Sequence, residues 1–450
     1  MHHRLRSQLF VCVVALATVA ANADQTPWEK YLDQVRELRI KGAYVDAVKP
    51  ALAAVQEAEK SGHEDAKLAE SWNNLGTVYY ELGRYADAEK FYSRAVALWE
   101  KLLGPEDLVL AQGLNNLAVL YLRTGRYEEA ELIGRHVLAV REKQLSPNDP
   151  AVAEILNNLA EINRAQGRSS EAESQYKRAV SICEKVLGLE HSQTAQGLSN
   201  LASLYTSEGR YAEAEPLLQR GLAIMEKALG PDHPDVATSL NNMSSRVAFA
   251  QILINSGTLR ALQHDDSGAK AAFDRALAIS DKALGRDHVQ VGFALEAIAM
   301  LTHKQGHYAG AEPLYKRSLA ILEKNLGSEH PHTALLEASL AKLYLAQQRN
   351  TEAEALLEKA IPVLANAGDT DPATLAVVVS DLAGAYQRDG RFSKAGPLYA
   401  RVWAIVRQTP QVLNDEIRTG LRAYVQLLRK MKRETDAREL DTQLKTLLPR

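Results

Sequence analysis

The stretch "LNNLAVLYLRTGRYEEAE", residues 114–131, decides the fold. Its first half places apolar side chains at helical spacing up to Tyr121, and a second helical pattern begins after Gly125. Glycine suits the left-handed turn that ends a helix, and the small side chains of Ala118 and Ala130 let two helices approach closely. The stretch therefore predicts a hairpin of two antiparallel helices.

The turn position of this hairpin returns at a constant interval of 42 residues. It is occupied in two series by Gly83, Gly125, Gly167 and Gly209, and by Gly306, Gln348, Gly390 and Lys432. One hairpin cannot cover its own apolar faces, whereas stacked hairpins bury a continuous core between neighbours. The sequence therefore predicts an all-α solenoid of stacked antiparallel helical hairpins.

Composition and motifs argue against several classes of function. The chain has 53 Lys and Arg residues against 56 Asp and Glu residues, so it lacks the basic surplus on which nucleic-acid binding depends. It also lacks the nucleophile elbow, the phosphate-binding loops and the zinc-protease motif. We expect no nucleic-acid partner, no catalytic site, no cofactor and no metal.

The first 23 residues differ from the rest of the chain. Basic Arg4 and Arg6 precede the apolar run "LFVCVVALATVA" of 12 residues, and Ala21 and Ala23 fit the site of a signal peptidase. The run is shorter than the roughly 20 apolar residues that span a bilayer. We expect cleavage after Ala23, export to the periplasm or the medium, and no membrane span thereafter; an uncleaved anchor is the alternative.

Cysteine usage excludes an internal disulfide in the mature chain, because only Cys183 follows the predicted cleavage point. It shares an apolar stripe with Ala179, Ile182 and Val186 at helical spacing. We expect a buried thiol that packs as a small hydrophobic group.

The sequence pattern of the repeat resembles that of the tetratricopeptide repeat family. The residues that carry the resemblance in one unit are Trp72, Leu75, Gly76, Tyr79, Gly83, Tyr85, Ala88, Tyr92 and Ala95. The 42-residue period resembles the kinesin-light-chain subtype, and the resemblance covers residues 28–448. It implies a right-handed superhelix whose concave face, lined by the first helix of each hairpin, binds peptides.

The period also predicts how the chain is divided. Gly209 and Gly306 stand 97 residues apart, 13 more than two periods, and we expect a lengthened helix broken near residues 255–257. This insertion either has no function or forms a hinge or a binding protrusion. The predicted divisions are 1–23 (signal peptide), 24–69 (N-terminal partial repeat or cap), 70–245 (first lobe), 246–268 (insertion within the fifth repeat), 269–416 (second lobe) and 417–450 (degenerate capping repeat).

Asparagines recur inside the first helices, where each costs up to about 0.7 kcal/mol in helix propensity relative to alanine. The resemblance assigns the second asparagine of each pair to an asparagine ladder that binds a peptide backbone: Asn74, Asn116, Asn158, Asn200 and Asn242. The candidate groove residues are these and their neighbours: Asn73, Asn74, Asn115, Asn116, Asn157, Asn158, Asn200, Asn241, Asn242, Arg123 and Arg164.

Two interpretations of the asparagine ladder remain open at this point. The amides, each with a donor and an acceptor, bind a ligand, or they bond backbone between repeats. We expect the first asparagine of each pair to face solvent, which favours the ligand. After residue 290 the ladder positions hold Ala297, Ser339 and Asp381, so binding should concentrate in the first lobe.

Histidines recur in the loops between hairpins as His191, His233, His288 and His330. Equivalent loops of successive hairpins stand about 10 Å or more apart, too far to share one metal ion. We expect these loops to start the next helix, with Pro234 and Pro331 in its first turn.

These features together predict a non-enzymatic scaffold that binds protein or peptide partners on the concave face. The alternative is a structural auxiliary subunit of an envelope secretion or polysaccharide-export assembly. The sequence leaves the oligomeric state, the partner and the pathway open.

Overall fold

The computed structural model describes residues 25–60, 62, 64–228, 239–367 and 370–447, and of residues 228 and 239–246 it describes the backbone alone. The predicted signal peptide, His233 and Pro234 lie outside these residues. None of the described helices has the length and apolar character needed to cross a membrane.

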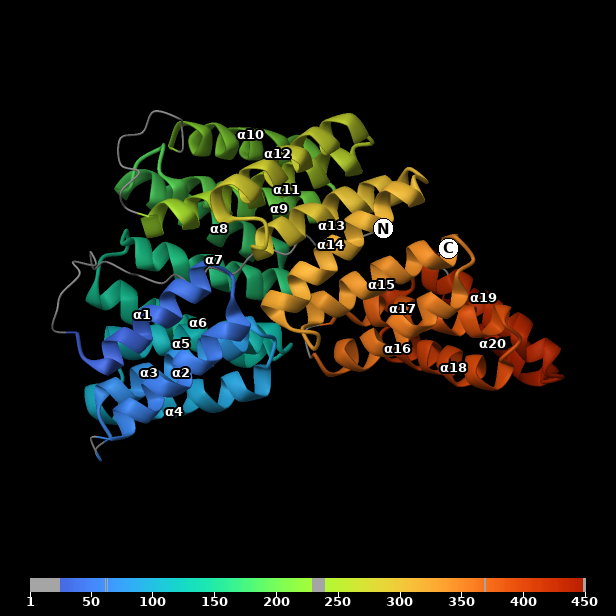
Figure 1. The fold of residues 1–450 in the computed structure, drawn as a ribbon, viewed down its shortest axis with the longest axis horizontal. Coiled ribbons are helices and arrows are strands. Elements are labelled where there is room, and N and C mark those ends of the chain that lie inside the picture. The colour runs from blue at the N-terminus through green and yellow to red at the C-terminus, as the bar shows by residue number, and fades with distance from the viewer. Residues whose placement is uncertain (1–24, 61, 63, 229–238, 368–369, 448–450) are drawn as a thin grey trace. The chain divides into compact units, whose positions relative to one another are not determined.

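The described residues fold into helices that follow one another in antiparallel pairs (Figure 1). These are α1(Pro27–Ile40), α2(Tyr44–Glu59), α3(Ala66–Glu81), α4(Tyr85–Leu103), α5(Leu108–Arg123), α6(Tyr127–Gln144), α7(Pro150–Ala165), α8(Ser169–Val186), α9(Ser192–Ser207), α10(Tyr211–Ala228), α11(Ser239–Leu262), α12(Asp266–Leu284), α13(Val289–Lys304), α14(Tyr308–Leu326), α15(Pro331–Ala346), α16(Asn350–Asn366), α17(Pro372–Arg388), α18(Phe392–Gln408), the short 3-10 helix η1(Pro410–Val412), α19(Asp415–Lys430) and α20(Glu434–Thr446). The all-α solenoid of stacked hairpins is confirmed.

The turn inside each hairpin has the left-handed conformation that the glycines predict. Gly125 has φ 75°, and the Arg126 amide donates to the Tyr121 carbonyl over 2.8 Å, which closes the end of α5. Gln348 and Lys432 adopt φ 63° and 60° at the same position of later hairpins. Loss of the glycine in those hairpins therefore left the turn geometry intact.

The loops between hairpins end in N-caps, as predicted. Asp149 accepts a hydrogen bond from the Ala151 amide over 2.8 Å, and His191 Nδ1 accepts one from the Gln193 amide over 3.2 Å. Pro331 occupies the first turn of α15. A side-chain acceptor at this position satisfies a backbone amide that has no partner inside the helix.

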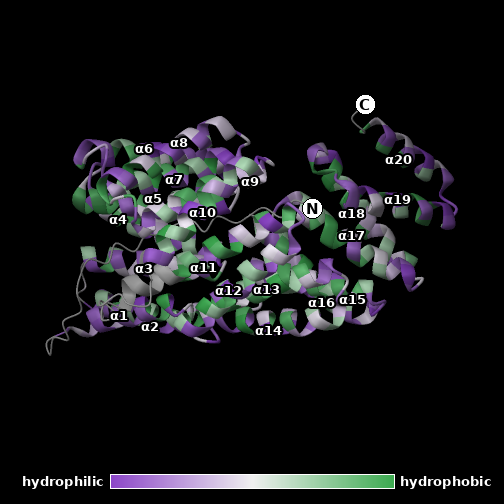
Figure 2. Ribbon diagram, turned by 90° about the horizontal axis from the view of Figure 1, so that it is seen from above, coloured by the Kyte–Doolittle hydropathy of each residue, from purple (hydrophilic) through white to green (hydrophobic). Residues whose placement is uncertain are grey.

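In each unit the core lies between neighbouring helices, and Figure 2 shows hydrophobic residues on the helices of both units. The second helices contribute large buried rings, such as Tyr92, which is 1 % exposed. This ring lies on Gly76 of α3, where an added Cβ would meet it at 2.8 Å. The Leu-Gly pair of the repeat therefore makes room for the tyrosine of the second helix.

The turn arginine of the repeat joins adjacent hairpins. Arg126 pairs with Glu89 of the preceding hairpin over 2.5 Å, and its guanidinium stacks on Tyr121 at 3.8 Å from the ring centre. The same pairing recurs between Arg349 and Glu312 over 2.7 Å. Because these ion pairs are partly exposed, each adds only about 0–1 kcal/mol, and their contribution is mainly geometric.

The chain divides into two compact units: Met1–Leu301 with Ala320–Gly327, and Thr302–Leu319 with Ser328–Arg450. The prediction of a break near residues 255–257 is wrong, because α11 continues through them to Leu262. Gly257 is there for packing: an added Cβ would meet the Phe273 ring at 2.5 Å. Gly257 is thus equivalent to Gly76, and the Phe273 ring lies against it as the Tyr92 ring lies against Gly76.

Candidate functional site: the asparagine ladder

The asparagines of the first helices form hydrogen bonds between hairpins. Asn116 Nδ2 donates to Asn73 Oδ1 over 3.0 Å, and Asn158 Nδ2 donates to Asn115 Oδ1 over 2.9 Å. In both bonds the second asparagine of one pair meets the first asparagine of the preceding pair. The paired arrangement in the sequence therefore has a structural reason: Asn116 bonds to the preceding hairpin, and Asn115 accepts a bond from the following one.

The ladder continues through α9 to α11. Asn200 Nδ2 donates to Asn157 Oδ1 over 3.5 Å, and Asn255 Nδ2 donates to Ser199 Oγ over 3.0 Å. Asn255 therefore makes a ladder bond in this hairpin.

The side chains of Asn241 and Asn242 lie outside the described residues. Asn255 stands nine residues before His264, which has φ 64°, just as Asn200 stands nine before Gly209. The extra residues of this hairpin therefore precede its ladder position. Asn255 can be found by counting nine residues back from the turn, but the turn itself is not evident in the sequence because His264 stands where most hairpins have glycine.

The expectation that the first asparagine of each pair faces solvent is wrong for Asn115, which is 1 % exposed. Its Nδ2 donates to Glu154 Oε1 over 3.0 Å. Asn73 and Asn157 are half-buried. The amides are enclosed because the first helices of successive hairpins pack directly on one another.

A buried ion pair supports the centre of the ladder. Arg141 Nη1 lies 3.2 Å from Glu154 Oε2, and Arg141 Nη2 donates to Gln112 Oε1 over 2.6 Å. Burial raises the pKa of the Glu154 carboxyl, whereas Arg141 and the amides of Gln112 and Asn115 lower it. The sequence did not predict this network; Glu154 stands four residues before Asn158, one turn away on the same helix face.

The ladder leaves some polar atoms unused. Among the described residues, no group donates to Asn116 Oδ1 or Asn158 Oδ1, whose nitrogen atoms are held by the preceding hairpin. Asn74 takes no part in the bonds between hairpins, because its Nδ2 donates to the Glu70 carbonyl of its own helix over 2.9 Å. The first helices thus hold two oriented acceptors on buried side chains, Asn116 and Asn158, together with the half-buried amide of Asn74.

The two candidate arginines are engaged with neighbouring side chains. Arg123 Nε donates to Tyr80 Oη over 3.0 Å, and Arg164 Nη2 pairs with Glu161 Oε2 over 2.6 Å. Glu161 is itself buried and bonds to the Tyr176 hydroxyl. Burial, together with the Glu161 charge, raises the pKa of Tyr176 well above its usual value.

The second unit has a different surface at the ladder positions. Ser339 Oγ donates to the Leu335 carbonyl of its own helix over 3.0 Å, and Asp381 Oδ2 lies 3.9 Å from Lys342 Nζ. Burial raises the pKa of Asp381 to about 6, although Lys342 opposes the shift. No amide ladder joins these hairpins at Ser339 or Asp381.

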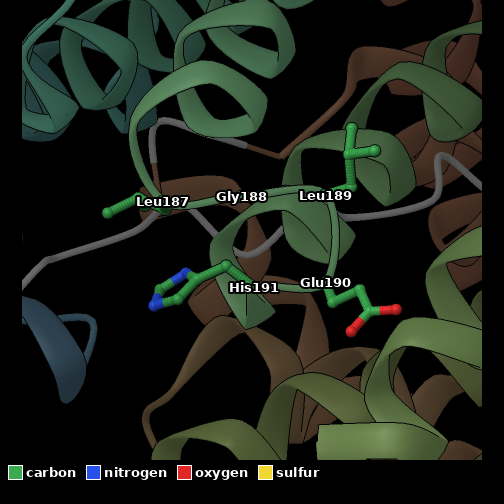
Figure 3. A pocket seen from close by; sticks show the side chains of 5 residues that line it. All are labelled: Leu187, Gly188, Leu189, Glu190 and His191. Atoms are coloured by element: carbon green, nitrogen blue, oxygen red, sulfur yellow. The ribbon is translucent and has the colours of Figure 1, made fainter.

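An open hollow of about 510 Å³ lies beside the loop between α8 and α9, away from the ladder. Leu187, Gly188, Leu189, Glu190 and His191 line it, and Figure 3 shows their side chains pointing in different directions. Small-molecule sites usually have polar groups that converge on one point, and this hollow lacks that arrangement.

The remaining candidate chemistry is sparse in the described part of the chain. No three His, Cys, Asp or Glu side chains gather there as metal ligands would. Cys183 is buried, as predicted, and burial raises the pKa of its thiol to about 11. A thiol in that state is a poor nucleophile at neutral pH.

These features define an α-helical repeat protein with a row of amides on its first helices. The tetratricopeptide repeat model matches residues 67–143, 134–185, 248–324 and 294–366, more than half of the chain, and a second tetratricopeptide repeat model matches residues 194–235. The chain belongs to the tetratricopeptide repeat family.

Several solved structures are similar to this chain. BtubC (BKLC) from P. vanneervenii is 26 % identical, with a TM-score of 0.42, over 54 % of this chain and 93 % of that one. A putative kinesin light chain with nearly identical TPR-like repeats from Podosopora anserina is 24 % identical, with a TM-score of 0.36, over 49 % and 98 %. Aspartyl phosphate phosphatase F from Bacillus subtilis is 15 % identical, with a TM-score of 0.49, over 88 % and 98 %. No curated protein matches the chain.

Proposed function

We propose that this protein is a non-enzymatic scaffold that binds an extended protein segment on the first-helix face, the surface formed by α3, α5, α7 and α9 of the first unit. The observation that carries the proposal is the pair of unused acceptors, Asn116 Oδ1 and Asn158 Oδ1, held in place by their own Nδ2 bonds. Membership of the tetratricopeptide repeat family supports a protein or peptide ligand.

The unused acceptors favour an extended ligand over a helical one. An acceptor needs a donor, and a peptide main chain offers N–H groups only where they are not already bonded. In a helix all but the first few N–H groups are bonded internally, whereas an extended segment keeps them free. The ladder oxygens therefore suit the N–H groups of an extended segment, whatever its side chains.

The test begins with crosslinking in native cells and mass spectrometry to identify the partner. Binding is then measured with Asn74→Arg, which adds bulk and charge to the first-helix face without breaking a bond between hairpins. The matched control is Ser93→Arg at an exposed position of α4. We expect at least a tenfold loss of affinity for Asn74→Arg alone; equal affinities would refute the proposed face.

A synthetic segment of the partner separates the extended from the helical mode. N-methylation of single main-chain nitrogens removes one donor at a time and leaves the side chains unchanged. We expect weakened binding at the positions that face the ladder. Binding that survives every N-methylation would show that the ladder oxygens do not recognise the main chain.

A second candidate function follows from an exposed apolar edge. Seven exposed large hydrophobic residues lie in or beside three successive loops between hairpins of the first unit: Leu102, Leu103, Leu108, Val109, Leu145, Val186 and Leu189. Such a row marks a surface that a permanent partner would cover. It favours a subunit of an envelope assembly, in which Leu145→Asp with Leu189→Asp would abolish stoichiometric co-purification and Asn74→Arg would not.

The place of action is also part of the proposal. The segment 1–23 has the three parts of a secretory signal, which supports an exported and periplasmic or secreted protein. Both candidate functions are compatible with that location.

A further inference from the structure

Two distant parts of the first unit meet around His288. His288, which precedes α13, places Nε2 3.1 Å from the carbonyl oxygen of Ile40, the last residue of α1. The next turn is also close, since a Cβ added to Gly42 would lie 3.1 Å from Val289 Cγ1. The first hairpin, α1 with α2, therefore closes onto a helix that follows it by about 250 residues.

The imidazole of His288 uses both nitrogen atoms. Nδ1 accepts a hydrogen bond from the Gln290 amide over 3.1 Å and so caps α13. Nε2 must then carry the hydrogen and donate it to Ile40. Only a neutral ring with the hydrogen on Nε2 satisfies both partners, and at 5 % exposure the ring has little access to water.

At the starts of α5, α7 and α9, the capping side chain does not also bond to a distant hairpin among the described residues. Asp107 and Asp149 cap α5 and α7 as acceptors, so capping alone does not require histidine. His191 caps α9 through Nδ1, but its Nε2 has no hydrogen-bond partner in the described part of the chain. His288 is thus distinguished from the equivalent His191 by its second bond, which reaches the first hairpin.

We propose that His288 is a latch that holds the first hairpin against α13, and that losing its Nε2–H donor opens the first unit. The closing contact includes one side-chain hydrogen bond, the packing of Gly42 on Val289 and an approach of α1 to α11, and it is small compared with the packing within each hairpin. The closure does not depend on the function proposed above.

The consequence for ligand binding rests on that proposed function. Polar side chains of α5, α7 and α9 are buried in the closed unit: Asn116, Asn158, Gln196, Asn200, Ser203 and Thr206. A partner can contact them only after a rearrangement. The latch would therefore regulate how much of the first-helix face a ligand can reach.

Acidification should release the latch. Burial lowers the pKa of His288, and the bond to Ile40 opposes this to a smaller extent. An opened unit exposes the ring, whose pKa then returns to about 6.5. Because the open state binds the proton more readily, the closed state loses stability as the pH falls below about 6.5.

Other ionisable groups lie on the elements around the contact. They are Arg39, Lys41 and Tyr44 on the first hairpin, Arg286 and Asp287 in the loop before α13, and Lys324 on α14. Asp287 pairs with Lys324 over 2.6 Å, and burial raises the pKa of Tyr44 far above neutrality. Glu81 of α3 lies 3.8 Å from Arg39, and burial raises the pKa of its carboxyl, so the His288→Asn chain is the control that separates its titration from that of His288.

The experiment measures the distance between nitroxide labels at Lys41→Cys and Arg286→Cys, two exposed positions flanking the contact, by pulsed electron resonance on the full chain. The variant is His288→Asn, because asparagine caps a helix well but is too short to reach Ile40. His191→Asn is the matched control, since it makes the same change at a cap without the second bond.

We expect one short distance in the parent chain and in His191→Asn at pH 8. His288→Asn should raise the longer-distance population about five- to tenfold, which corresponds to the loss of one net hydrogen bond of about 1–1.4 kcal/mol. The same distance distribution in both variants would overturn the proposal.

A pH series on the parent chain gives a second measurement that needs no variant to fold. The longer-distance population should grow between pH 7.5 and 5.5, and an unchanged distribution would overturn the release by protonation.

Discussion

Replacing Asn115 with alanine tests whether the asparagine ladder joins the hairpins. Asn115 accepts from Asn158 Nδ2 over 2.9 Å and donates to Glu154 Oε1 over 3.0 Å, and all three residues are buried. Alanine leaves the Asn158 donor and the Glu154 acceptor without these partners, at about 1–3 kcal/mol each. Alanine recovers up to about 0.7 kcal/mol in helix propensity, so the free energy of unfolding should fall by about 1.5–5 kcal/mol.

Asn74→Ala is the matched control. Asn74 lies at a ladder position but bonds only to the Glu70 carbonyl of its own helix, so alanine should be neutral or slightly stabilising there. Urea unfolding followed by circular dichroism compares the two variants with the parent. Repeat arrays can unfold in steps, so hydrogen exchange in α5 and α7 should accompany the unfolding curves.

The reasoning would be refuted if Asn115→Ala and Asn74→Ala had the same small effect on unfolding. It would also be refuted if the Asn115→Ala loss appeared only in hairpins remote from α5 and α7. In either case the bonds would not hold adjacent hairpins together.

Three further predictions concern the turn, the second unit and the N-terminus. Gly125→Val should cost about 1–2 kcal/mol, because a β-branched side chain is strained at φ 75°, whereas Gly125→Asn should cost less; thermal melts compare them. Burial raises the pKa of Asp381 to about 6, so its ionisation destabilises the fold as the pH rises from about 4 to above 6. Asp381→Asn should therefore raise the melting temperature at pH 7 and leave it nearly unchanged at pH 4, and an equal rise at both would contradict this origin. The intact mass of the protein from the soluble envelope fraction should correspond to cleavage after Ala23, and a membrane-bound species that retains residues 1–23 would contradict it.

The period of the sequence predicted the hairpins because their turns and caps are local. A left-handed residue such as Gly125 and an acceptor such as Asp149 act on their own helix, so their residue types suffice to place them. The turn at His264 shows the limit of this reasoning. Its conformation matches the glycine turns, but histidine is not a residue type that indicates such a turn, so the sequence did not predict the ladder bond of Asn255.

The contacts of the candidate site could not be read from the sequence in the same way. The bond from Asn115 to Glu154 spans 39 residues and depends on how two hairpins stack, which no local pattern encodes. The same holds for His288. Its local sequence is similar to that around His191, but of these two residues only His288 bonds to a distant hairpin. Residues that repeat in sequence can therefore differ in role because the solenoid brings different neighbours to each.

The two interpretations of the asparagine ladder are compatible because an amide has two ends. In Asn116 and Asn158 the nitrogen is committed to the preceding hairpin, which accounts for asparagine in a helix at a cost in propensity. The oxygen of the same amide has no donor among the described residues and is held in a fixed orientation by the nitrogen bond. A structural bond thus preorganises a binding atom, which lowers the entropy that a ligand loses on binding. A ladder fixed in this way recognises main-chain N–H groups and ignores side chains, so any selectivity for a partner must come from the residues beside the ladder, such as Glu70 and Asn74.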